Sequence, residues 1–198
     1  MFLNEKGRTS VKNDGLMPSA LSGPVLDFLM PKITLLGNGG AIWILAAPIL
    51  LCTKKYRRQG VLLLVGLIAG VLVGNACLKN LIARPRPCWL DSSVQLLIAN
   101  PADYSFPSGH TLSSVIGATG LTKTNRRFGY AANPLAALFA FSRLYLYVHF
   151  PSDVLAAAVL GVALGELVWR CGGKLLGRWH APRGRQRAWS GEIQKRPG

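Results

Sequence analysis

Residues 61–82 form a long apolar run that constrains the fold more than any other part of the chain. A helix needs about 20 apolar residues to cross the hydrocarbon core of a bilayer, and this run is about that long. Gly66, Gly70 and Gly74 recur every four residues, so one face of the helix lets a neighbouring helix approach closely. The run therefore predicts a membrane-spanning helix that packs against another helix.

Further apolar runs indicate that the whole chain is an all-α, polytopic membrane helix bundle. Half of the residues are hydrophobic and 16% are charged, which is too apolar for an ordinary soluble domain. The runs cover residues 24–36, 41–52, 109–121, 129–148 and 152–169. The first is broken by Asp27, Pro31 and Lys32, and predicts either a short spanning helix or one in the membrane interface. The runs 24–36 and 109–121 are shorter than a usual span, which predicts a tilted bundle or a locally thinned bilayer.

The net charge of +15 is concentrated in clusters between the apolar runs. Clusters at residues 54–58 and 123–127 fall at one end of the bundle together with the basic tail, and the positive-inside rule assigns that end to the cytoplasm. This pattern argues against a nucleic-acid partner, because no basic stripe interleaved with aromatics is present. Six spans would place the N-terminus inside, in agreement with Lys6, Arg8 and Lys12, whereas five spans would place it outside.

These patterns divide the chain into three parts. Residues 1–23 form a polar N-terminal segment, and residues 24–171 form the membrane-embedded domain. Residues 172–198 form a basic cytoplasmic tail, which we expect to be disordered because it lacks the apolar residues of a core. The tail would either bind anionic lipid headgroups or act only as a topology signal. The sequence predicts no oligomeric state.

Four cations fall at the opposite end of the bundle, against the positive-inside rule, which suggests a function. They are Lys79, Arg84, Arg86 and Arg143. The last of them precedes His149 and Asp153, which are four residues apart on either side of a predicted helix start at Pro151. Asp153 is then within reach of one ring nitrogen of His149, and the fixed tautomer presents the other nitrogen as a nucleophile or base.

Three segments meet at this end, and their side chains suit phosphoryl chemistry. Lys79, Arg86 and Arg143 supply positive charge, and the Ser108 hydroxyl and the Gly109 backbone amide supply donors at a helix start. His149 would attack phosphorus, and the second histidine, His110, would protonate the leaving oxygen. The fixed cations would neutralise the phosphoryl oxygens, so we expect no metal ion and no cofactor.

Each motif also has an ordinary structural explanation when it is taken alone. Lys79 would snorkel to the interface, the Arg84–Pro87 stretch would be an extended loop, and His110 would be an interfacial histidine after a turn. His149 would be a histidine at the membrane interface, and Asp153 would cap the N-terminus of the following helix. The three motifs agree in order, spacing and side of the membrane, and this agreement favours a shared site.

The motifs K-x6-RP, PSGH and SR-x5-H-x3-D resemble those of the type 2 phosphatidic acid phosphatase superfamily, which also contains the vanadium haloperoxidases. They are complete between Lys79 and Asp153, and the helical pattern extends the resemblance over residues 24–170. The resemblance implies a six-helix core with a short first helix and a phosphohistidine mechanism. His149 would be the nucleophile, Asp153 its orienting partner and His110 the general acid. The phosphoryl group would be bound by Lys79, Arg86, Ser108, Gly109 and Arg143.

The expected function is therefore that of an integral-membrane lipid phosphatase with its site facing the extracellular or periplasmic side. The chain resembles small bacterial undecaprenyl diphosphate phosphatases, and phosphatidate or phosphatidylglycerol phosphate are alternative substrates. A lipid phosphotransferase and a non-enzymatic membrane relative remain open as other classes. The expected partners are the lipid phosphate substrate and the membrane lipids. The four cysteines show no CxxC spacing, and neither a zinc site nor a disulfide is expected.

Overall fold

The computed structural model describes residues 23–91 and 94–179, with side chains to residue 175. This part of the chain is helical throughout and holds no β-strand, which confirms the predicted all-α class. The longer helices are α1 (Pro24–Leu36), α2 (Ala41–Cys52), α3 (Arg57–Gly70), α6 (Gly109–Thr124), α7 (Arg126–Tyr145) and α8 (Pro151–Trp179). Short elements are the 3-10 turn η2 (Asn38–Gly40), the π-helix η3 (Val71–Leu78), α4 (Lys79–Ile82) and α5 (Pro87–Leu90).

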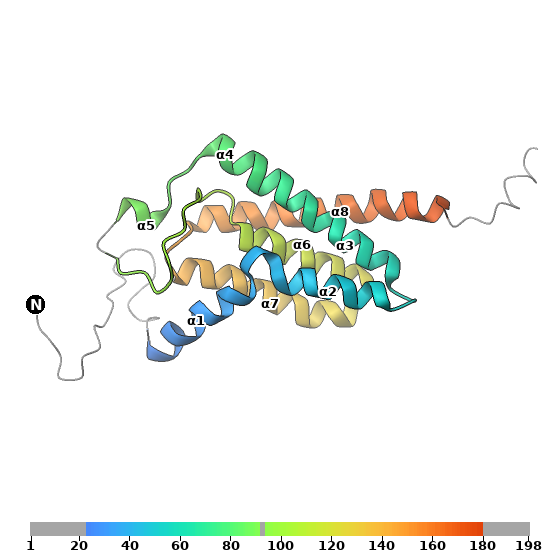
Figure 1. Cartoon of the computed structure of the whole chain (residues 1–198), viewed down its shortest axis with the longest axis horizontal. Coiled ribbons are helices and arrows are strands. Elements are labelled where there is room, and N and C mark those ends of the chain that lie inside the picture. The colour runs from blue at the N-terminus through green and yellow to red at the C-terminus, as the bar shows by residue number, and fades with distance from the viewer. Residues whose placement is uncertain (1–22, 92–93, 180–198) are drawn as a thin grey trace, which may run out of the picture.

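Helices α1 and α2 follow one another in the same general direction along the bundle (Figure 1). They are bent by 40° at the glycine-rich turn η2, where Gly39 and Gly40 have φ of 59° and 75°. These positive φ values favour glycine, which explains the local sequence Asn38-Gly39-Gly40. The described chain therefore starts at the same end as the α7–α8 connection, and Asp27 accepts a 2.6 Å hydrogen bond from Tyr145 there. Lys6, Arg8 and Lys12 lie outside the described residues.

By length and composition, two of the described helices are able to cross a membrane, namely Arg57–Leu90 and Pro151–Leu175. The bent pair α1 and α2 makes a third candidate if it counts as one span. The shorter α6 lies in the middle and packs against α3, α7 and α8. Its burial explains how a helix below the usual span length is accommodated, because its neighbours cover it along its length.

The predicted glycine face of residues 61–82 is confirmed as a helix-packing surface. A side chain added at Gly66 or Gly70 would meet Ile116, and one added at Gly74 would meet Leu112. Both partners are buried residues of α6. Because these glycines have no side chains, α6 lies directly against the continuous helical segment formed by α3 and η3.

Trp43 anchors the core between α2, α6 and α7. It is 2% exposed, donates a 3.1 Å hydrogen bond from Nε1 to Ser114, and packs edge-on against Phe139. Its ring lies so close to Gly117 that an added Cβ would come within 2.4 Å of it. The position therefore needs glycine for space rather than for backbone freedom.

We expect Gly117→Ala to lower the free energy of unfolding by about 1–3 kcal/mol, the usual cost of overpacking a core. Thermal unfolding in detergent would measure this change. Gly173→Ala on α8 is the matched control, since nothing lies within 4 Å of its added Cβ and alanine favours a helix over glycine. Equal stability of the two variants would contradict this account of the core.

Helix α8 runs to Trp179 and so extends past residue 171, where the basic tail was predicted to begin. Two contacts with α3 explain the extension. Gly172 lies against Leu62, and Arg58 donates a 3.3 Å hydrogen bond to the carbonyl of Gly173. Residues 180–198, the rest of the predicted tail, lie outside the described residues.

Candidate active site

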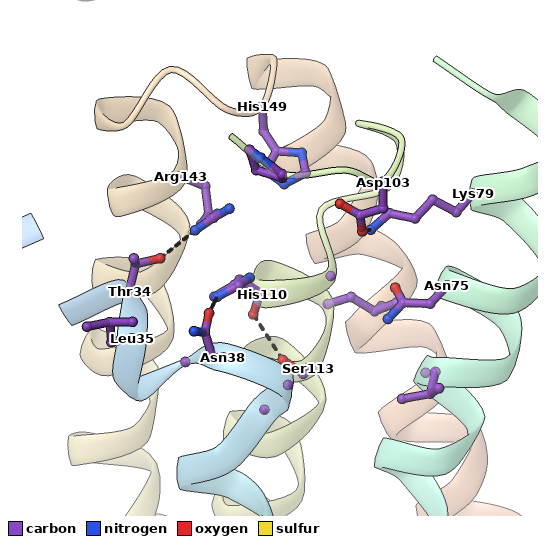
Figure 2. Close-up of a pocket in the computed structure, with 18 of the residues that line it drawn as sticks. Thr34, Leu35, Asn38, Asn75, Lys79, Asp103, His110, Ser113, Arg143 and His149 are labelled. Atoms are coloured by element: carbon purple, nitrogen blue, oxygen red, sulfur yellow. Dashed lines mark hydrogen bonds and ion pairs between the residues drawn. The ribbon is translucent and has the colours of Figure 1, made fainter. Parts of the chain in front are cut away.

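A cavity of about 450 Å³ opens at the end of the bundle where α4 and α7 end and α6 and α8 begin. Figure 2 shows polar side chains from several helices and from the connections before α6 and α8 converging on it. Six of the eight predicted site residues line the cavity: Lys79, Arg86, Gly109, His110, Arg143 and His149. The other two, Ser108 and Asp153, are fully buried behind it. The structure thus brings the three predicted segments together.

Local sequence signals place these segments at helix ends. Ala83 has a φ of 46° and ends α4, after which the chain turns toward Pro87 at the start of α5. Gly109 begins α6, and Pro151 begins α8. Proline at a first helical turn loses no hydrogen bond, because that amide has no partner within the helix. Each motif therefore lies where a helix starts or stops, with its polar groups facing the cavity.

The two ring nitrogens of His149 have different surroundings. Nε2 lies 3.1 Å from an Nη1 donor of Arg86, and Nδ1 lies 3.4 Å from the Ser105 hydroxyl. The nearest Asp153 oxygen is 3.8 Å from Nδ1, which is longer than a hydrogen bond. Ser105 donates to Asp153 at 2.5 Å and so stands between the histidine and the carboxylate. Asp153 was predicted as the direct orienting partner, and the structure adds this serine to the pair.

His149 is 3% exposed, and this burial is the main reason that its pKa falls to about 4. The charges of Arg86 and Arg143 lower the pKa of His149 further, whereas Asp153 raises it. The imidazole is therefore neutral at physiological pH. A neutral imidazole keeps a lone pair available for nucleophilic attack.

The Asp153 carboxylate, which lies near His149, accepts hydrogen bonds from three donors. Arg84 Nη1 lies 2.7 Å from Oδ1, and the Phe150 backbone amide donates to Oδ2 at 3.0 Å. Ser105 supplies the third contact. Three partners compensate for the complete burial of this carboxylate. Arg84 therefore contacts the site through Asp153 instead of through the cavity.

Lys79 and Arg86 both pair with Asp103, a residue of the long connection before α6. Arg86 Nη2 lies 2.5 Å from Oδ1, and Lys79 Nζ contacts Oδ2. Arg86 also donates from Nε to the Asp103 carbonyl at 2.6 Å and from Nη1 to the Val148 carbonyl at 2.7 Å. Burial by itself raises the pKa of Asp103, but Lys79 and then Arg86 outweigh it and lower the pKa to about 2.

Arg143 is the third cation of the cavity and is 4% exposed. It donates to the Thr34 hydroxyl of α1 at 2.5 Å. Within the described residues its Nε atom is buried and has no hydrogen-bond partner. Because Arg143 also lines the cavity, its guanidinium supplies positive charge to an anion bound there.

His110 faces the cavity from the first turn of α6, and Asn38 of η2 fixes its ring. The His110 Nε2 atom lies 2.9 Å from Asn38 Oδ1, as the dashed line in Figure 2 shows. Because an amide oxygen only accepts, Nε2 carries the proton in this arrangement. Asn75 of η3 points to the same region, with Oδ1 3.1 Å from where a Cβ of Gly109 would lie. Glycine is needed at this position to leave the space open.

Several site residues were not predicted from the sequence. They are Thr34, Asn38, Asn75, Asp103 and Ser105. Asn38 lies in a stretch that reads only as a turn, and Asp103 and Ser105 lie in a polar connection without periodicity. The apolar context of Asn75 was the one usable signal, since a polar residue inside a membrane run usually has a function.

A family model described as the PAP2 superfamily matches residues 59–176. An undecaprenyl-diphosphatase of Sulfolobus acidocaldarius is 34% identical over 121 residues, which cover 61% of this chain and 58% of that protein. Undecaprenyl-diphosphatase BcrC of Bacillus subtilis is 31% identical over 146 residues, which cover 74% of this chain and 75% of that protein. The alignment thus spans less than two thirds of the archaeal relative's own length.

Among solved structures, the chain is similar to the transmembrane PAP2 type phosphatidylglycerolphosphate phosphatase of Bacillus subtilis. The TM-score is 0.62 at 27% sequence identity, and the match covers 83% of this chain and 82% of the other. This likeness confirms a multi-pass membrane architecture for the chain.

Proposed function

This chain belongs to the PAP2 superfamily, and from that premise we propose that it hydrolyses a lipid phosphate through a phosphohistidine intermediate. One observation carries the proposal. The neutral His149 presents Nε2 beside a guanidinium donor in a cavity lined by three cations. A nucleophile next to fixed positive charge is what attack on an anionic phosphoryl group needs.

The first step follows from the positions of the two histidines. His149 Nε2 attacks phosphorus, the bond from phosphorus to the leaving oxygen breaks, and the imidazolium form of His110 gives one proton to that oxygen and becomes neutral. Lys79, Arg86 and Arg143 neutralise the charge on the phosphoryl oxygens, and the Gly109 amide adds a donor at the start of α6. Asp153 and Ser105 hold the imidazole during the attack.

The second step reverses these roles. Water attacks the phosphohistidine, the His110 base accepts a proton from the water, and the phosphorus–nitrogen bond breaks to release phosphate and neutral His149. The described lining of the cavity supplies three cations and a single carboxylate, that of Asp103, so the proposed reaction neutralises the phosphoryl charge without a metal ion. The site instead stabilises charge with fixed side chains.

The proposed substrate is a polyprenyl diphosphate, with undecaprenyl diphosphate favoured. Two of the relatives named above are undecaprenyl-diphosphatases. The cavity also has an apolar side formed by Leu67, Val71 and Leu112, which suits a lipid chain rather than a soluble sugar phosphate. The solved structure named above makes phosphatidylglycerol phosphate the second candidate.

A phosphate-release assay on detergent-purified protein tests the proposal. The panel holds undecaprenyl diphosphate, phosphatidate, phosphatidylglycerol phosphate and a soluble phosphate ester, each with and without EDTA. We expect release from the lipid diphosphate that EDTA leaves unchanged. Release only when an acceptor lipid is added would identify a phosphotransferase, and loss of activity with EDTA would contradict the metal-free reaction.

We propose that the site faces the extracellular or periplasmic side. The clusters at 54–58 and 123–127 lie at the opposite end of the bundle from the cavity (Figure 1). The positive-inside rule favours the cytoplasm for that end. With the four native cysteines replaced by serine, labelling of Tyr130→Cys and of Pro101→Cys in intact cells would test this. An impermeant reagent should reach only position 101.

The pH dependence follows from the burial of His149. Its pKa of about 4 lies below the ordinary value of 6.5, so the imidazole is protonated and inactive only below about pH 4. We expect kcat/KM, after correction for the ionisation of the substrate, to fall on the acid side with a midpoint near pH 4. A midpoint near 6.5 would contradict a buried, neutral nucleophile.

A further inference from the structure

Asp103 occupies the place where the proposed function puts a phosphoryl group. Its two carboxylate oxygens contact Arg86 and Lys79, which are both buried and both line the cavity. Figure 2 shows this carboxylate near Lys79 and His149. A carboxylate with two oxygens directed at two cations reproduces part of the contact that a phosphoryl group would make.

The carboxylate is placed so that it can leave without disturbing the site. The Asp103 side chain is 56% exposed, whereas those of Lys79 and Arg86 are 9% and 3% exposed. The Asp103 backbone is separately held by the 2.6 Å contact from Arg86 Nε to its carbonyl oxygen. Rotation of the side chain toward solvent would therefore free two cations while the connection stays in place.

We propose that Asp103 is an internal competitor of the phosphoryl group that promotes release of the phosphate product. This inference rests on the proposed function for the identity of the anion site. Three buried cations around a small dianion would bind it tightly and slow its departure. The Asp103 carboxylate is tethered beside these cations and can pair with them again as the phosphate leaves. Between turnovers it keeps Lys79 and Arg86 paired, when an unpaired buried charge would be costly.

Arg143 has a different role in this exchange. It lines the cavity and forms no ion pair with a carboxylate among the described residues, because Asp103 pairs with Lys79 and Arg86 instead. An incoming phosphate can therefore bind first to Arg143 and then displace the carboxylate from Arg86 and Lys79. This order allows entry without leaving all three cations unpaired at once.

Binding of inorganic phosphate to purified protein at pH 8 tests this role without any need for turnover. The readout is the phosphate dependence of thermal unfolding, which gives the Kd because a ligand of the folded state stabilises it. We expect Asp103→Asn to bind phosphate at least about tenfold more tightly than the unaltered protein, since the competing charge is removed. Glu166→Gln is the control, because Glu166 pairs with Lys123 away from the cavity. Its phosphate affinity should be unchanged.

An alternative in which Asp103 only orients Lys79 and Arg86 predicts the opposite sign. In that case Asp103→Asn would bind phosphate more weakly, and this result or an unchanged Kd would overturn the proposal. Asp103→Glu keeps the charge and should bind phosphate within about threefold of the unaltered protein. This variant shows whether a change in phosphate affinity comes from the lost charge or from a general effect of substitution on folding. One further outcome separates this inference from the proposed function. If neither the unaltered protein nor any variant releases phosphate from a lipid, the proposed function fails. If Asp103→Asn still binds phosphate more tightly in that case, the role of Asp103 as a competitor for the anion site stands.

Turnover supplies a second readout of the same role. With the preferred lipid, Asp103→Asn should lower both KM and kcat and strengthen inhibition by added phosphate, because product release becomes slower. Loss of kcat with an unchanged phosphate inhibition constant would contradict the proposal. An effect through folding alone would not tighten product inhibition.

Discussion

Phosphate release from every substrate is expected to fall by about 10⁴-fold or more when His149 is replaced by alanine, because the variant lacks the proposed nucleophile. The replacement removes Nε2, which lies 3.1 Å from Arg86 in the cavity. Binding of inorganic phosphate should persist in this variant, since the three cations remain. A rate assay and a phosphate-binding assay on the same preparation would separate lost chemistry from lost folding.

His110→Ala is the informative comparison for this variant. A phosphate ester with a good leaving group, such as nitrophenyl phosphate, needs little protonation when it departs. We therefore expect His110→Ala to retain phosphoryl transfer from nitrophenyl phosphate but not from phosphatidate, whose leaving group is an alkoxide, whereas His149→Ala is inactive on both. Activity of His149→Ala on nitrophenyl phosphate would exclude His149 as the nucleophile.

Arg86→Lys is expected to lower kcat/KM by about 10²–10³-fold although it keeps the positive charge. The guanidinium uses all three nitrogens, with contacts to Asp103, to the Val148 carbonyl and to His149. A lysine ammonium is a point donor and cannot reproduce this fork. Steady-state kinetics on the preferred lipid would measure the loss.

Arg84→Lys is the matched control two residues away in the same segment. Arg84 uses a single nitrogen, Nη1, toward Asp153 and Ser152. A lysine can supply one donor there, so we expect a loss of less than about tenfold. Equal losses in the two variants would show that the effect depends on charge alone and not on the geometry of Arg86.

The helices were largely predictable because apolar runs and basic clusters follow directly from the cost of placing polar groups in a bilayer. The glycine spacing in residues 61–82 also predicted a helix contact, and Ile116 and Leu112 fill it. The course of α1 and α2 is not predictable in this way, since the sequence does not specify whether a glycine turn reverses a chain or bends it. The extent of α8 depended on contacts with Leu62 and Arg58, which are distant in sequence.

The site was predictable where its residues recur at fixed spacing at helix ends. His149, Arg86 and Lys79 belong to such motifs, and the structure brings them to one cavity. Asp103 lies in the long connection before α6, and Asn38 lies in the short turn η2. Nothing in the local sequence of either residue indicates which side chain it contacts. Their contacts come from tertiary packing, which no periodicity encodes.

The most direct test of the phosphohistidine mechanism is to trap the intermediate. His110→Ala incubated with nitrophenyl phosphate should accumulate phosphoenzyme, because the variant lacks the base that activates water for the second step. After an alkaline quench, which preserves phosphohistidine, mass spectrometry of the peptides should locate one phosphate on His149. Turnover of nitrophenyl phosphate with no phosphate on His149, or with phosphate on another residue, would contradict the account.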